Sequence, residues 1–217
     1  MNTLQARRTD APRRARLVAG LSALAILSAC SVVSRPDAAM LYDLGPLRTQ
    51  ASSSTQTSQP PTSLPPLSIA DVQVPAWLDS SLIFYRLNYA NEQQPRPYAQ
   101  ARWSMPPGQL LQQHLKSRLA AAGGAVLSPS AAAANVPVLR IEADDFTQIF
   151  SSPTQSTGQV SLRASVFRER TLIAQRSFVR QAPAPAADAG GGVRALAGAS
   201  DAALGDMIAW LATLNLK

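Results

Sequence analysis

The chain has little of the chemistry that catalytic and metal sites need. Its 217 residues include one cysteine and one histidine. A disulfide within the chain is therefore excluded, and a zinc site built from several cysteine and histidine ligands cannot be assembled. The glycine-rich phosphate-binding motifs and the G-x-S-x-G turn of serine hydrolases are also absent. These absences predict a protein that is not an enzyme and that carries no metal and no cofactor.

Acidic residues are also few, and the basic excess is unevenly placed. The chain has 20 basic and 13 acidic residues, a formal net charge of +7. Five of the arginines stand within the first 16 residues, with only Asp10 against them. Removing residues 1–29 would lower the net charge from +7 to +3. Because the basic character belongs mainly to this leader, we predict no nucleic-acid partner.

The leader lacks an apolar run long enough to span a membrane. Residues 17–27 form an apolar stretch of 11 residues, whereas a spanning helix needs about 20. An arginine-rich segment precedes this stretch, and Leu-Ser-Ala-Cys at 27–30 follows it, which matches the bacterial lipobox. The pattern predicts a lipoprotein signal peptide over residues 1–29, with cleavage before Cys30 and lipid on its thiol. The alternative is a buried anchor helix with an incidental cysteine.

Residue 31 bears on where such a lipoprotein resides. Bacterial lipoproteins retained in the inner membrane commonly carry aspartate after the lipidated cysteine, and this chain has Ser31. We therefore predict the periplasmic leaflet of the outer membrane. One acyl chain anchors a protein only marginally, and the several chains of a bacterial lipoprotein make the attachment effectively permanent. Residues 30–39 would form the tether.

Residues 40–217 are predicted to form a single domain with one insert. Sixteen of the 19 residues in 48–66 are Ser, Thr, Gln or Pro. Such a segment cannot bury apolar surface, so we predict a disordered insert at the surface.

Period-two alternation predicts strands, and a 3.6-residue period predicts two helices. The expected strands are 40–47, 67–75, 81–89, 138–146, 159–167 and 172–179. The expected helices are 105–124 and 193–214, with 90–97 and 181–192 as loops. The predicted class is α+β, a two-layer α/β sandwich with a mostly antiparallel sheet of about five to six strands. Two helices would cover one face, in the order ββ(β)-α-βββ-α.

Two sets of side chains could carry chemistry. His114 lies on the first helix, and we predict that it sits at the edge of the packed face. Glu142 and Asp144 share one face of a strand, so their geometry allows a catalytic carboxylate pair. The same alternation is typical of a solvated sheet face, which is the interpretation we prefer.

Four residues near the first helix are candidate partner contacts. Trp77 stands beside a proline, and Tyr98, Arg102 and Trp103 precede the helix. Aromatic rings beside arginine are common anchors of protein interfaces. The alternative is that these side chains pin loops to the core.

Three segments resemble one known family. They are MLYDLGP at 40–46, the stretch 67–88 containing VPAWLD, and the stretch 98–124 containing ARW. They are similar, in the same order, to the ABC-type transport auxiliary lipoproteins, with the likeness running over about 40–215. The chain departs from the family in its long insert and in Gln100, which interrupts a compact YARW.

The resemblance implies a non-enzymatic accessory subunit. Its partners would be an MCE-type substrate-binding protein and the components of an ABC transporter that moves lipids or other hydrophobic molecules between the two membranes. Assembly with further copies of this chain stays open. Two alternatives remain: a free-standing periplasmic lipoprotein that holds a lipid between sheet and helices, and an enzyme acting through Glu142 and Asp144.

Overall fold

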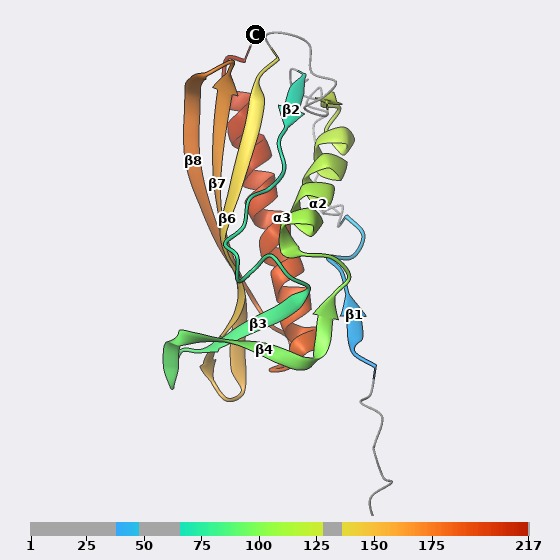
Figure 1. Cartoon of the computed structure of the whole chain (residues 1–217), viewed down its shortest axis with the longest axis vertical. Helices are drawn as coiled ribbons and strands as arrows, with labels where there is room; N and C mark the ends of the chain where they lie inside the picture. The colour runs from blue at the N-terminus through green and yellow to red at the C-terminus, as the bar shows by residue number, and fades with distance from the viewer. Residues whose placement is uncertain (1–37, 48–65, 128–135, 217) are drawn as a thin grey trace, which may run out of the picture. The chain divides into compact units, whose positions relative to one another are not determined.

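Three long strands form one side of a sheet in the computed structural model, which describes residues 38–47, 66–127 and 136–216 (Figure 1). The predicted signal peptide, the predicted lipidation site Cys30 and nearly all of the predicted tether and insert lie outside the described residues. From Ala39 onward the chain forms one compact unit.

The three strands are an antiparallel meander of β6 (Val138–Ser152), β7 (Gln155–Arg168) and β8 (Thr171–Pro183). Alternate residues of β6 and β7 are buried against the helices. Each strand is longer than predicted because the alternation continues through polar residues, and only two residues connect β6 to β7. Two residues also connect β7 to β8, with Glu169 at a φ of 56°.

The other edge of β6 carries two separate groups of strands. The first half of β6 pairs with β2 (Leu67–Ile69), which pairs with β5 (Val126–Leu127). The second half pairs with β3 (Leu82–Leu87), followed outward by β4 (Asn91–Trp103) and β1 (Met40–Tyr42).

This arrangement confirms the α+β class and corrects the predicted sheet. Over the described ranges the sheet has eight strands, and the order of elements is ββββ-α-ββββ-α. Four of the seven strand pairings are parallel, so the sheet is mixed rather than mostly antiparallel. The physical reason is that β2 and β3 both return to the same edge of β6 in the same direction.

The strand β4 corrects the predicted loop over 90–97. It forms an antiparallel hairpin with β3, although its first half is polar and includes two prolines. Pro97 stands opposite Phe84, and the register shifts twice along the pair. Proline is tolerated in such a strand near a sheet edge or a bulge.

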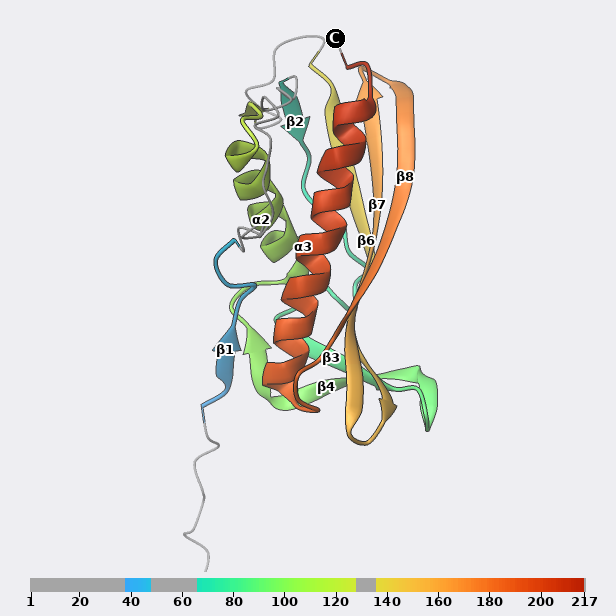
Figure 2. The ribbon, with the colours of Figure 1, turned by 180° about the vertical axis from the view of Figure 1, so that it is seen from behind.

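Both predicted helices are confirmed, and they lie on the same side of the sheet (Figure 2). The first, α2 (Pro107–Ala121), begins with proline in its first turn. The second, α3 (Ala189–Thr213), starts earlier than predicted, so the expected flexible link over 181–192 is wrong. Asp188 caps it by accepting a hydrogen bond from the Gly191 N–H at 2.6 Å.

The core fills the space between α3 and the three long strands. Leu162, Leu196 and Met207 have no measurable exposure. Gly158 of β7 lies so close to α3 that a β-carbon there would come within 2.5 Å of the Leu196 nitrogen. The predicted packed-edge position of His114 is confirmed, since it is 8% exposed and its Nε2 lies 2.7 Å from Asp201 of α3.

Candidate functional site

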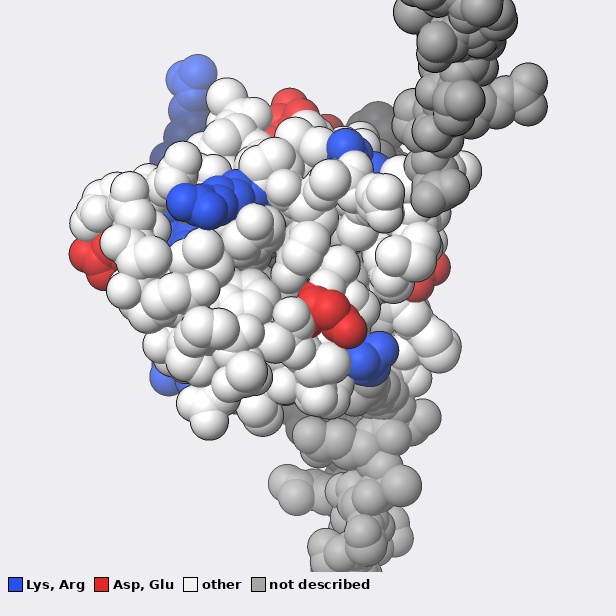
Figure 3. Space-filling model, turned by 90° about the horizontal axis from the view of Figure 1, so that it is seen from below, with Lys and Arg blue, Asp and Glu red and all other residues white. Residues whose placement is uncertain are grey.

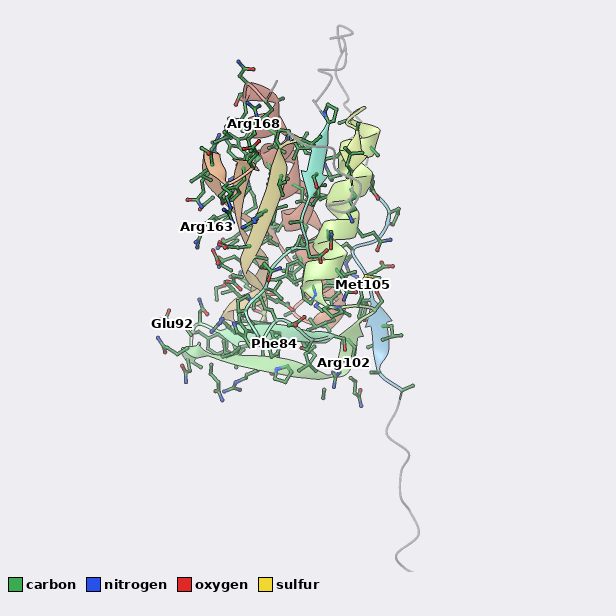
Figure 4. All side chains as sticks on the ribbon, turned by 45° about the horizontal axis from the view of Figure 1, so that its top comes forward. Phe84, Glu92, Arg102, Met105, Arg163 and Arg168 are labelled. Atoms are coloured by element: carbon green, nitrogen blue, oxygen red, sulfur yellow. The ribbon has the colours of Figure 1, made fainter. Side chains whose placement is uncertain are left out.

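The four predicted contact residues gather at the end of the sheet formed by β3 and β4. Trp77 belongs to the turn before β3, and Tyr98, Arg102 and Trp103 belong to β4. Figure 4 shows Arg102 and Phe84 at this hairpin, away from Arg163 of the three long strands. Folding therefore brings the four residues into one region, and it exposes them to different degrees.

Trp103 is part of the core. Its side chain is 1% exposed and packs against Phe146 of β6, with ring centroids 5.4 Å apart. Its backbone N–H donates to the Ser81 carbonyl at 2.7 Å. The indole thus joins β4 to the body of the sheet and offers almost no surface to a partner in this conformation.

Tyr98 is half-buried and bound to β6. Its hydroxyl donates to the Gln148 side-chain oxygen at 2.8 Å, and the Gln148 amide donates to Ser156 at 2.8 Å. Gln148 is fully buried. Burial raises the pKa of the Tyr98 phenol above its ordinary value, and the nearby Tyr85 and Asp188 add to that shift.

Close contacts with Gln148 and with the loop before the helix explain two glycines at the start of α3, Gly192 and Gly191. A β-carbon on Gly192 would overlap the Gln148 side chain, and one on Gly191 would overlap the Ala186 carbonyl. Glycine at 192 lets the first turn of α3 approach β6, and glycine at 191 lets it approach the preceding loop. Sequence reasoning missed this network and assigned residues 181–192 to a loop, although the Asp188 cap is a recognisable helix start.

Trp77 and Arg102 keep part of their surface. Trp77 packs edge-on against Phe84 at 5.3 Å, with the Arg86 guanidinium 5.4 Å from its ring. Arg102 donates to the carbonyls of Tyr98 and Ala101 at 2.5 and 2.8 Å. Both side chains are therefore held in place while remaining partly accessible.

The strand β1 adds two apolar residues to this region that sequence reasoning did not single out. Leu41 stands opposite Arg102 in the parallel pair and is 70% exposed, and Met40 is 56% exposed. A groove of about 430 Å³ lies between β1 and α3, with Leu41, Leu44 and Val193 in its wall. Seen from below, this end carries few and scattered charges (Figure 3). We call Met40, Leu41, Trp77, Tyr98 and Arg102 the hairpin surface.

The carboxylates considered for catalysis lie elsewhere, on the outer face of the sheet. Arg163 of β7 forms ion pairs with Glu142 at 3.2 Å and with Asp144 at 3.1 Å. All three side chains are about half exposed. This geometry fits the predicted solvated face. Within the described ranges, no three His, Cys, Asp or Glu side chains come together to hold a metal ion, and no helix is long and apolar enough to cross a membrane.

Comparison with known families and structures fits this arrangement. Residues 42–209 match the family model of the ABC-type transport auxiliary lipoprotein component. The chain belongs to this family. The match extends from β1 nearly to the end of α3, so it covers the sheet and both helices. No curated protein is significantly similar to the chain.

Two crystal structures share the fold of this auxiliary lipoprotein. Protein XCC0632 from Xanthomonas campestris, of the family DUF330, is 18% identical with a TM-score of 0.62; the alignment covers 72% of this chain and 88% of that one. An uncharacterized protein is 16% identical with a TM-score of 0.63, over 81% of this chain and 99% of that one. At these identities the likeness shows the fold alone.

Proposed function

We propose that this auxiliary lipoprotein is a non-catalytic subunit that docks an MCE-type substrate-binding protein of an ABC transport system. The system would move lipids or other hydrophobic molecules between the inner and outer membranes. The family match over 42–209 carries the proposal. The lipobox at 27–30 supports lipid attachment at Cys30, and Ser31 in place of aspartate supports the periplasmic leaflet of the outer membrane.

The hairpin surface is the proposed contact with the MCE protein. Leu41 and Met40 expose apolar area, while Trp77 and Arg102 are held by neighbouring groups and remain partly accessible. Such pre-positioned side chains lose little conformational freedom when a partner covers them. Only about ten residues separate Cys30 from β1, which limits this end to within roughly 35 Å of the anchoring bilayer.

The packing between sheet and helix disfavours the alternative of a lipid held there. That space is filled by fully buried side chains, and the backbones of Gly158 and Leu196 nearly touch. A lipid chain would have to displace α3 from the sheet. Non-covalent lipid that still copurifies with the protein after its lipid anchor is removed, detected by mass spectrometry, would restore this alternative.

The test combines the state of the anchor with site-specific crosslinking. Intact-mass analysis of the mature protein from separated membranes should show an acylated Cys30 in the outer-membrane fraction. The Cys30→Ala variant should lose both the added acyl mass and the outer-membrane location. A photocrosslinking amino acid placed at Leu41 should capture the MCE protein. The same group at the half-exposed Glu142 on the outer sheet face is the matched control. Absence of the MCE protein from both positions would refute the docking role.

A further inference from the structure

The strand β8 forms a free border of the sheet. It is 13 residues long and pairs only with β7 in the part of the chain that the structure describes. Figures 1 and 2 show it at the outer side, with no strand beyond it. Every second residue of such an edge points its backbone N–H and C=O outward, ready to pair with another chain.

A groove of about 320 Å³ lies between this edge and α3. The rings of Phe178 and Trp210 belong to its lining and meet edge-on at 5.7 Å. Arg176 and Arg180 lie two residues on either side of Phe178, so all three side chains project to the helix side of the sheet. The groove thus has an aromatic centre flanked by two guanidinium groups.

The charge of the edge selects the kind of partner. Residues 170–183 contain three arginines and no acidic residue. Arg180 is ion-paired with Asp206 of α3, whereas Arg176 stacks over the Phe178 ring at 5.6 Å and has no ion pair among the described residues. A carboxylate opposite Arg176 would therefore gain a partner without breaking an existing one.

We infer that β8 binds an extended, acidic segment of a partner protein, which adds to the sheet as a further strand. In register, the segment places an apolar side chain beside Phe178 and a carboxylate two residues away beside Arg176, with a second carboxylate toward Arg180. The motif is acidic-x-apolar-x-acidic. This goes beyond the proposed function, because it names the chemistry of the bound segment and depends neither on Cys30 nor on the hairpin surface.

A second copy of this chain fits the edge less well. Antiparallel pairing of two β8 strands centred on Phe178 would set Arg176 of one copy opposite Arg180 of the other, twice. Like charges directly opposite each other destabilise a strand pair. An acidic partner removes this repulsion, which is why we assign the edge to a segment of opposite charge.

The probe is a fluorescein-labelled peptide, Ser-Thr-Glu-Thr-Leu-Thr-Glu-Thr-Ser, added to the full chain purified in detergent. We expect saturable binding by fluorescence anisotropy, and protection of β8 amides in hydrogen-exchange mass spectrometry. Arg176→Glu should weaken binding about tenfold. Arg163→Glu, which changes the same charge on the outer face of the neighbouring strand, should leave binding unchanged.

A charge-swapped peptide, with lysine in place of both glutamates, distinguishes a charge effect from misfolding of the Arg176→Glu variant. It should bind Arg176→Glu better than the unchanged chain, which a general loss of structure cannot produce. The inference is overturned if the acidic peptide does not bind, if both peptides bind alike, or if exchange protection falls outside β8. Dimerisation through β8 that the peptide does not compete with would assign the edge to a second copy and would also overturn it.

Discussion

The hairpin surface and the free edge of β8 both set aromatic rings beside arginine, yet they differ in what the fold leaves unsatisfied. At the hairpin, Tyr98 is bonded to Gln148, and Arg102 donates to two backbone carbonyls. At the β8 edge, the rings of Phe178 and Trp210 are already packed, while the outer backbone groups of β8 are unpaired and Arg176 has no ion pair among the described residues.

The difference shows that aromatic composition does not by itself locate a contact. An indole such as Trp103 can be buried entirely in the core. A strand edge, by contrast, keeps outward-facing backbone N–H and C=O groups whatever its side chains are. At the hairpin surface, Trp77, Tyr98 and Arg102 are held by neighbouring groups, which suits a preformed contact. The β8 edge is open and charged, which suits an extended segment.

Replacing Trp103 by alanine should give the largest effect and should separate core from contact at the hairpin. The indole is 1% exposed and packs on Phe146, so its loss should lower the free energy of unfolding by about 3–5 kcal/mol. Trp77→Ala, at a partly exposed ring, should cost well under half as much. Urea unfolding followed by circular dichroism measures both. Equal losses would mean that the two indoles share one structural role.

Gly158→Ala should be nearly as damaging, because the new β-carbon would meet the backbone of α3 at 2.5 Å. Relieving the overlap requires moving the helix, with an expected loss of about 2–3 kcal/mol. Gly198→Ala is the matched control: its β-carbon would meet only Ala182, at 3.6 Å. That change should stabilise α3 by about 0.5–1 kcal/mol. Thermal unfolding of the two variants should therefore shift in opposite directions.

Tyr98 should make the hairpin end sensitive to alkaline pH, which the β8 edge is not expected to be. Because the pKa of Tyr98 is higher in the folded than in the unfolded chain, its stabilisation is complete below the ordinary pKa of 10.0 and falls as the pH rises above that value. Tyr98→Phe should cost about 1 kcal/mol near neutral pH, through the lost hydrogen bond to Gln148.

Denaturant unfolding at a series of pH values up to about 11 checks this expectation. The difference in unfolding free energy between the unchanged chain and Tyr98→Phe should shrink as the pH rises past 10. A difference that stays constant would show that Tyr98 ionises equally in both states and is not shielded by the hairpin.

The parts of the fold that follow a local pattern could be predicted from sequence. Leu139 and Ile141 on β6, like Val160 and Leu162 on β7, alternate with polar residues and are buried as expected. The sequence pattern did not predict the hairpin strand β4, because the first half of this strand is polar and interrupted by prolines. The parallel pairing of β2 and β3 with β6 depends on contacts between distant segments, which no local period encodes.

The candidate site, too, could be predicted from sequence only in part. The sequence singled out Trp77, Tyr98, Arg102 and Trp103 as candidate partner contacts near the first helix, and the structure places them at the β3–β4 end of the sheet. It could not separate the buried ring from the accessible one, because burial depends on which strand lies opposite. The Tyr98–Gln148 bond joins residues 50 positions apart, so the polar network was visible only after folding.

The smallest expected effects on stability come from replacing two arginines, one on each face of the sheet near the β8 edge. Arg163→Ala removes two ion pairs on the outer face, but all the groups involved are about half exposed to solvent. Such pairs contribute little, so the unfolding free energy should change by less than about 0.5 kcal/mol. Arg176→Ala, at an exposed position of β8, should be equally mild in the same urea titration.

These two exposed arginines then differ only in what surrounds them. Arg163 faces its own carboxylates on a closed part of the sheet, while Arg176 faces an unpaired strand edge and an aromatic groove. If both variants unfold alike and only Arg176→Ala weakens the acidic peptide, the border acts in recognition rather than in stability. A large loss of stability in Arg176→Ala would instead make that arginine a structural clamp on Phe178, and the open edge would lose its chemical selectivity.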